Sequence, residues 1–221
     1  MRWSRAHCAL VQHFRLLCGM AVVGIVAAGS PCFAQGGLTV VRVEEDWELV
    51  IDTPDPNSDG PQLNCVLSAP AADDTLYAVF EINHRTLPEF VKGGMQLQVW
   101  SNSFNLAAEP GPREAPLAAV GETIRWTQAM ELADGQITFE ILNGASTTWG
   151  DFGGQGYLKS SQLTDLANLN GYAPSDSVTN SGISYAANRV QSLVLKRVRY
   201  VASTGDTWED SVPKTVHQKL D

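Results

Sequence analysis

Residues 55–60, with the sequence DPNSDG, have the residue types and spacing of a calcium loop. Carboxylate and amide oxygens at alternate positions are ligands that a hard cation prefers, and Gly60 permits the tight turn. At the twelfth position of the loop, where such loops carry a bidentate acid, this chain has Val66, and a strand-like run replaces the usual helix. Asp55, Asn57 and Asp59 are therefore a candidate calcium site, while a turn held by proline and aspartate is the favoured alternative.

Aromatic side chains in and after a glycine-rich stretch could form a platform that stacks on sugar rings. Trp149, Phe152 and Tyr157 interleave with four glycines, and Tyr172 follows. The stretch lacks the Gly-Lys-Ser/Thr ending of a phosphate loop. Trp149, Tyr157 and Tyr172 are the candidate ligand-binding residues. Packing in the core is the favoured alternative for them, and both interpretations apply to Trp100 as well.

The sequence offers little for catalysis. It has no Gly-x-Ser-x-Gly nucleophile elbow. Beyond residue 34 it has two histidines, His84 and His217, and one cysteine, which do not supply the ligand spacing of a zinc site. Glycoside hydrolysis needs two facing carboxylates about 5–9.5 Å apart. Glu48 and Asp52 share one face of a predicted strand, but their cross-strand partners are unknown. We therefore assign no catalytic residue, and a polysaccharide-cleaving enzyme stays as an alternative.

Residues 188–201 are the densest apolar run outside the N-terminus, and four of them are Val. β-Branched residues favour a pleated surface, so the run is predicted as a central strand, although its apolar spacing also fits a helix. The run ends in the only basic cluster, Lys196, Arg197 and Arg199. Because the apolar residues before and after it differ in phase, we expect a β-bulge there. Pairing of this cluster with acidic residues is favoured over contact with an anionic polysaccharide.

The rest of the chain reads as short strands separated by turns. Predicted strands cover residues 37–43, 47–51, 62–68, 75–84, 95–100, 123–130, 136–142, 146–149 and 177–186. Acidic residues 44–46 split the first two, Asp134-Gly135 and Asn143-Gly144 are predicted turns, and residues 105–116 are a proline-rich connector. A short helix is expected over residues 161–168. This pattern predicts an all-β fold, an antiparallel β-sandwich with a concanavalin-like jelly roll favoured and a closed barrel as the alternative.

Residues 1–34 have the organisation of a signal peptide. Three arginines precede an apolar stretch of about 13 residues, and small residues at 32 and 34 suit cleavage before Gln35. That stretch is short for a membrane span of about 20 residues, so an uncleaved anchor is disfavoured. The sequence thus predicts export to the periplasm or the extracellular space. After removal of the signal we expect a β-sandwich domain over residues 35–202, a flexible polar tail over 203–221 and no membrane span.

The net charge limits the kinds of partner that the mature chain can bind, and the cysteine count limits its disulfides. The signal takes three of the 15 Lys+Arg residues, which leaves 12 basic against 24 acidic residues and a net charge of −12. Such a surface repels nucleic acid and anionic lipid. Three of the four cysteines lie in the signal, so no disulfide can form within the mature chain. The remaining one, Cys65, lies in an apolar run and is predicted to be a core residue.

Two segments resemble a group of uncharacterised secreted proteins of planctomycete-type bacteria: WGDFGGQGY at 149–157, and NSGISYAANRV at 180–190 followed by LVLKRVR at 193–199. The resemblance covers residues from about 46 to 200. It implies export and a β-rich domain, and no activity. The sequence therefore predicts an exported, non-catalytic β-sandwich with a binding or structural role. Its partner would be a polysaccharide or another envelope or extracellular protein, and a carbohydrate-binding domain is the first alternative. No cofactor is predicted beyond the candidate calcium.

Overall fold

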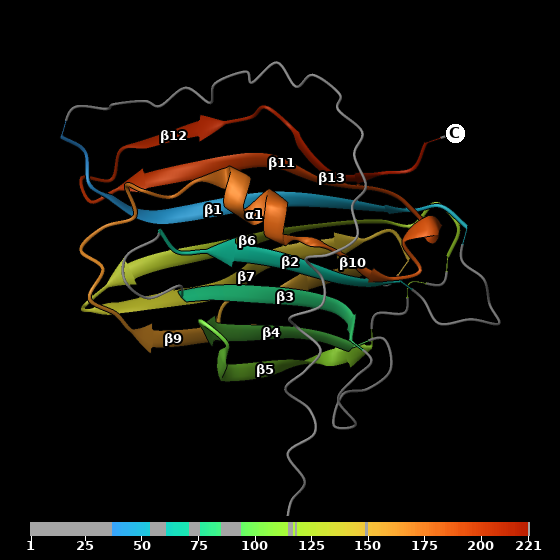
Figure 1. Cartoon of the computed structure of the whole chain (residues 1–221), viewed down its shortest axis with the longest axis horizontal. Helices are drawn as coiled ribbons and strands as arrows, with labels where there is room; N and C mark the ends of the chain where they lie inside the picture. Colours follow the sequence, from blue (N-terminus) through green and yellow to red (C-terminus); the bar gives the residue numbers. More distant parts are fainter. Residues whose placement is uncertain are drawn as a thin grey trace, which may run out of the picture. The chain divides into compact units, whose positions relative to one another are not determined.

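The computed structural model describes residues 37–53, 61–70, 76–84, 94–114, 117, 119–148 and 150–220. These residues form two antiparallel sheets and one short α-helix, which confirms the predicted all-β sandwich (Figure 1). The finer expectation of a concanavalin-like jelly roll stays a prediction. The chain from Gly37 onward is one compact unit.

Sheet A has eight strands in the order β12-β11-β1-β6-β7-β8, with β13 also paired to β11 and β9 also paired to β7. The strands are β1 (Val40–Ile51), β6 (Thr123–Ala133), β7 (Gln136–Ser146), β8 (Gly150–Gly153), β9 (Lys159–Leu163), β11 (Val190–Ala202), β12 (Thr207–Asp210) and β13 (Lys214–Gln218). Sheet B has five strands in the order β10-β2-β3-β4-β5. They are β2 (Gln62–Ser68), β3 (Leu76–His84), β4 (Gly94–Ser101), β5 (Phe104–Glu114) and β10 (Gly182–Tyr185).

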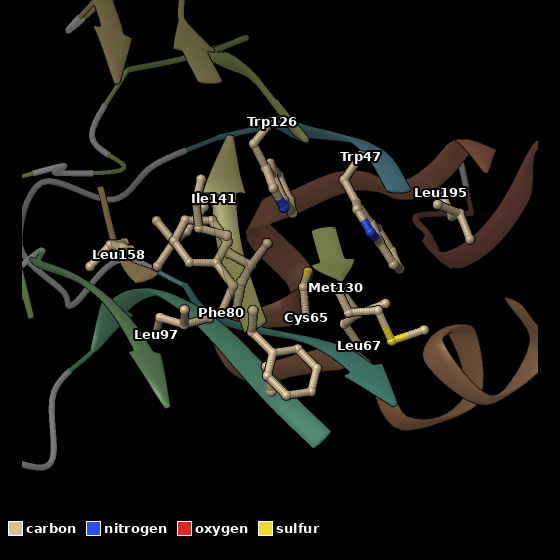
Figure 2. Close-up of a cluster of buried hydrophobic side chains, with 14 of the residues drawn as sticks. Trp47, Cys65, Leu67, Phe80, Leu97, Trp126, Met130, Ile141, Leu158 and Leu195 are labelled. Carbon is tan, nitrogen blue, oxygen red and sulfur yellow. The ribbon is translucent and has the colours of Figure 1, made fainter. Parts of the chain in front are cut away.

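The core lies between the inner faces of the two sheets. Alternate residues of each strand point inward, and Figure 2 shows Trp47 and Trp126 of sheet A pointing toward Phe80 and Cys65 of sheet B. The Trp47 and Trp126 rings stack with centroids 6.2 Å apart, and Phe80 meets Trp126 edge-on at 5.6 Å. Cys65 is 1% exposed, so its predicted place in the core is confirmed.

Strand β11 is central, as predicted for residues 188–201. It pairs with β1 on one side and with β12 and β13 on the other. The expected bulge is present: Asp46 pairs with Arg197 and Trp47 with Leu195, so Lys196 is the extra residue. The bulge keeps Leu193, Leu195 and Val198 all in the core.

Several predicted boundaries are wrong because strand pairing overrides local composition. The acidic residues 44–46 do not interrupt β1, since Glu44 and Asp46 face outward while Glu45 turns inward. Residues 105–116 are largely strand, because β5 is the last strand of sheet B and an edge tolerates prolines that cannot donate a ladder hydrogen bond. Asn143-Gly144 is not a turn, since β7 continues through both residues to Ser146.

The helix and the C-terminal tail are also corrected. Residues 161–168 are not helical, because β9 pairs with β7 and is followed by coil. The α-helix is α1 (Pro174–Asn180), with its proline in the first turn where no N–H is needed, and the strand expected over 177–186 shortens to β10. A flexible polar tail was predicted over residues 203–221, but its described residues, 203–220, are not one. They contain β12 and β13, and Trp208 of β12 stacks on Tyr200 with centroids 5.3 Å apart.

In the part of the chain that the structure describes, no helix is long and apolar enough to cross a membrane.

Candidate functional site

The structure separates the residues predicted to bind ligands. Asp55, Asn57, Asp59 and Trp149 lie outside the described residues. Tyr157 is half-buried beside Phe152, with ring centroids 6.4 Å apart, and packs against the core. Tyr172 is only 8% exposed and belongs to the core, so it cannot serve as a stacking platform. No two of the candidate aromatics are brought together on an open face within the described ranges.

Tyr172 instead belongs to a buried cluster around Glu45, which is fully buried on the inner face of β1. The Tyr172 hydroxyl donates to Glu45 Oε1, and the Trp47 indole and the Gln128 amide donate to Oε2 at 2.9 and 2.7 Å. Ser177 of α1 is a further hydrogen-bond partner. The cluster therefore ties sheet A, the segment before α1 and α1 itself to one carboxyl group.

Burial raises the pKa of Glu45 above its ordinary value, although the four hydrogen bonds act in the opposite direction. Burial also raises the pKa of Tyr172 well above its ordinary value, and the nearby Glu45 carboxylate adds to the shift. The same two causes, burial first, raise the pKa of the Cys65 thiol. Cys65 is thus a protonated core thiol rather than a nucleophile.

The outer face of sheet A carries a ladder of opposite charges. The basic cluster at the bulge pairs with acidic residues of β1: Arg197 Nε–Asp46 Oδ2 at 2.7 Å, Arg199 Nη1–Glu44 Oε2 at 3.1 Å and Lys196 Nζ–Glu48 Oε1 at 3.4 Å. The predicted pairing with acidic residues is therefore confirmed. Partial burial opposes ionisation of Glu48, but Arg125 and Lys196 lower its pKa overall. Asp52 pairs with Lys219, so both carboxylates considered for hydrolysis take part in ion pairs.

The outer face of sheet B carries a different arrangement, which we call the polar row: Trp100, Gln98, Glu81, Asn64 and Ser184, with Gln96 beside Glu81. These residues come from four neighbouring strands, β4, β3, β2 and β10. Register places Asn64 opposite Glu81 and Glu81 opposite Gln96. The inner-face neighbours in the same strands, such as Cys65, Phe80 and Leu97, fill the core.

Hydrogen bonds join most of the polar row into a chain. The Trp100 indole donates to Gln98 Oε1 at 2.8 Å, and Gln98 Nε2 donates to Glu81 Oε2 at 3.0 Å. The Asn64 amide nitrogen faces Glu81 Oε1 at 3.2 Å, because only this orientation gives both ends of the amide a partner, and its oxygen accepts from Ser184. Glu81 and Gln98 are each only 7% exposed, whereas Trp100 is half-buried and Ser184 is exposed, so the row reaches solvent only at its ends.

Gln96 is the exception in the polar row. It is fully buried, and neither its Nε2 nor its Oε1 has a hydrogen-bond partner among the residues that the structure describes. Gln98, two residues along the same strand, has both amide atoms satisfied. Buried polar groups without partners are rare and call for a specific explanation.

The chemistry that the polar row can support is recognition of hydroxyl groups. Its amides and carboxylate offer donors and acceptors, and Trp100 and the half-buried Tyr77 flank them. Glu81 is the one carboxylate in the row, whereas glycoside hydrolysis needs two. Across the described ranges no group of three or more His, Cys, Asp or Glu residues is arranged to hold a metal ion.

Two histidines lie in the described strands. His84 is the last residue of β3. His217 lies in β13, where its Nε2 is 3.1 Å from the carbonyl oxygen of Val190.

The sequence predicts which face of a strand is polar, but it does not predict the polar row or the cluster around Glu45. The two-residue alternation of residues 75–84 and 95–100 predicts that Glu81, Gln96 and Gln98 lie opposite the apolar faces of their strands, but it does not predict that strand register aligns them. Glu45 was not predicted to be an inner-face residue, because it lies between two other acidic residues. Its spacing of two residues from both Val43 and Trp47 is the signal that places it on the inner face.

No protein-family model and no curated protein matches the sequence. Among solved structures, the chain is similar to one described as the crystal structure of scytalido-glutamic peptidase with a transition state analog inhibitor. The sequence identity is 11%, the TM-score is 0.29, and the similarity covers 79% of this chain and 76% of that one. A likeness at this TM-score carries no argument about function.

Proposed function

We propose that this protein is an exported, non-catalytic binding protein, and that the polar row on the outer face of sheet B binds carbohydrate. The observation that carries the proposal is the hydrogen-bonded chain from Trp100 through Gln98 and Glu81 to Asn64. Sugars combine hydroxyl groups, which both donate and accept hydrogen bonds, with apolar ring faces that stack on aromatic side chains. The two ends of the row offer both kinds of contact: Ser184 and the half-buried Asn64 carry polar groups, and the half-buried Trp100 and Tyr77 carry aromatic rings.

The row also has the rigidity that a binding surface needs. Its side chains stand on the paired strands β10, β2, β3 and β4, and their hydrogen bonds to one another fix their orientation. A surface that is ordered before the ligand arrives loses less conformational entropy on binding. Export of the protein is supported by the predicted signal peptide.

Retention on insoluble cellulose, xylan and chitin tests the proposal. We expect wild-type protein to be retained on at least one of them and Trp100→Ala to lose at least about tenfold in affinity, since stacking on an aromatic ring is removed. Trp208→Ala is the matched control, because Trp208 is also half-buried but lies in sheet A. A Trp100→Ala variant that melts as a folded protein and is retained like wild type would contradict the proposal.

Trp149 supplies a competing explanation for any sugar binding. If Trp149→Ala abolishes retention while Trp100→Ala does not, the binding platform is the glycine-rich stretch and the assignment to sheet B is wrong.

A structural role is the second candidate, and one observation favours it. Strand β5 is the last strand of sheet B and exposes Phe104 at 74% and Leu106 at 46%. An unpaired strand edge with apolar side chains can pair with another chain. If the protein assembles through this edge, sedimentation of the wild type should show oligomers that Phe104→Ser abolishes, and a wild type that stays monomeric at high concentration argues against it.

A further inference from the structure

The outer face of sheet B is most accessible at the end that carries the hairpin between β4 and β5. Farther along the same strands, Glu81 and Gln98 are each only 7% exposed. The side chains at the hairpin end form a row across four strands, which we call the end row: Ser68 lies opposite Tyr77, Tyr77 opposite Trp100, and Trp100 opposite Asn105. The first three are half-buried and Asn105 is exposed, so a ligand in solution can reach the end row.

The two aromatic rings of the end row are held in place before a ligand arrives. The Trp100 indole donates to Gln98 Oε1 at 2.8 Å, and the Tyr77 hydroxyl donates to the Asn102 carbonyl oxygen at 3.3 Å. Asn102 lies in the two-residue hairpin between β4 and β5, where it has a positive φ of 52° that asparagine tolerates. The bond from Tyr77 ties β3 to this hairpin, so the rings have little conformational entropy left to lose on binding.

The end row carries no charged side chain, although the mature chain is strongly acidic. Ser68 and Asn105 offer hydrogen-bond donors and acceptors at its two ends, and the two rings between them offer apolar faces. The one carboxylate of the polar row, Glu81, is nearly buried and already accepts hydrogen bonds from Gln98 and Asn64. An uncharged row in an acidic protein suits a neutral ligand and disfavours an anionic one.

We infer that the end row is the part of the proposed site that contacts sugar, and that it binds one neutral polysaccharide chain running across the strands. The inference rests on the proposed function and adds the direction of the ligand to it. Neighbouring strands lie about 4.8 Å apart, so the end row spans about 14 Å from β2 to β5, enough for about three consecutive sugar rings. Neighbouring rings stack on Tyr77 and Trp100, while sugar hydroxyls bond to Ser68 and Asn105.

Variants at the two exposed ends of the polar row separate this site from its surroundings. Tyr77→Ala removes a stacking ring and should lower affinity at least about tenfold. Asn105→Ala changes an exposed side chain and should lower affinity about threefold. Ser184→Ala is the matched control, because Ser184 is exposed at the opposite end, and it should bind like wild type. Tyr77→Phe keeps the ring and should also bind like wild type, since the hydroxyl is engaged by Asn102.

Binding is measured first as retention on cellulose, xylan and chitin, with pectate as the anionic probe. We expect wild-type protein to be retained on a neutral polysaccharide and not on pectate. Calorimetric titration then uses fragments of the retained polysaccharide, from one sugar residue to six. Affinity should rise with length up to about three residues and change little beyond that, because the end row spans about 14 Å.

Four results would overturn the inference. Tyr77→Ala and Asn105→Ala variants that are folded and bind like wild type, or a Ser184→Ala variant that loses binding, place the sugar elsewhere, while carbohydrate binding itself stands. A single sugar that binds as tightly as a fragment of three excludes a chain across the strands. Retention on pectate shows that the ligand need not be neutral. A wild type retained on none of the four polysaccharides removes the proposed function and this inference together.

Discussion

Tyr172→Phe is the sharpest test of the buried Glu45 cluster, because it removes one hydrogen-bond donor and leaves the ring in place. The Tyr172 hydroxyl donates to Glu45 Oε1, and its ring meets Tyr200 edge-on with centroids 6.0 Å apart. The variant keeps the ring contact, so any loss of stability reports on the hydroxyl. Since Tyr172 is in the core, its loss should leave ligand binding unchanged.

The amount of stability that Tyr172→Phe loses depends on the charge of Glu45. A hydrogen bond to an ionised group contributes about 1.5–3 kcal/mol, and a bond between neutral groups about 0.5–1.5 kcal/mol. For a domain of this size each kcal/mol corresponds to about 2–4 °C in melting temperature. Tyr172→Phe should therefore lower the melting temperature by about 3–12 °C when Glu45 is ionised in the folded protein, and by less when it is protonated.

The pH dependence follows from the raised pKa of Glu45, whose ordinary value is 4.5. Above that value the unfolded chain has released this proton while the folded protein still holds it, so stability falls as pH rises toward the folded pKa. Glu45→Gln keeps the carboxamide neutral at every pH and removes this dependence. The stability of Glu45→Gln relative to wild type should therefore increase as pH rises above about 4.5, and level off once the folded carboxyl ionises.

A double-mutant cycle of Tyr172→Phe and Glu45→Gln, followed by thermal and urea unfolding at pH 4 and pH 8, measures the coupling directly. Tyr77→Phe is the matched control, because its hydroxyl makes only an exposed 3.3 Å bond to the Asn102 carbonyl oxygen. Zero coupling between Tyr172 and Glu45 at both pH values would refute the reasoning. A Tyr172→Phe variant that loses more stability at pH 4 than at pH 8 would also refute it.

Three further predictions concern the fold and the metal. Leu195→Asp places an unpaired charge in the core and should destabilise the protein by about 4 kcal/mol or more, whereas a variant with wild-type melting would show that β11 is exposed. Gly144→Ala builds a Cβ into the Phe152 ring and should cost about 1–3 kcal/mol, and Phe152→Leu in the same chain should restore part of this in urea unfolding; additive losses would mean that the two residues do not meet. If residues 55–59 bind calcium, calorimetric titration of the mature protein will release or absorb heat at millimolar calcium and the melting temperature will rise. The absence of both effects removes the site.

Strands with strict alternation were predictable from sequence. In β3 the residues Leu76, Ala78, Phe80 and Ile82 are all buried, as their spacing predicts. The bulge at Lys196 could also be predicted, because a change of phase between two apolar runs is a local property of the sequence.

Elements that depend on pairing were not predictable. Strands β12 and β13 are short and polar, and they form because β11 presents a free edge to them. Strand β5 contains prolines that argue against a strand until its place at the edge of sheet B is known. In β7, Gly144 reads as a turn residue, but its role is to leave room for the Phe152 ring.

The polar row could not be predicted either, because it too depends on how the strands pair. Each member could be assigned to a polar face from its own strand, but hydrogen bonds such as that from Gln98 to Glu81 require the register between β3 and β4. A single sequence does not specify that register. The complete burial of Gln96, a polar residue on the face opposite the core, is likewise visible only in the folded structure.

The pairing of β1 with β11 also sets the order in which this protein can fold. Asp46 and Arg197 bond to each other across 151 positions of the chain. β1 can pair with β6 earlier, but its other edge must wait for β11, so sheet A cannot be completed while the last part of the chain is still being synthesised. Such long-range pairing makes folding slow and leaves apolar strands unprotected in the meantime. A protein of this design therefore passes through a long interval in which its unpaired strand edges can associate with other chains.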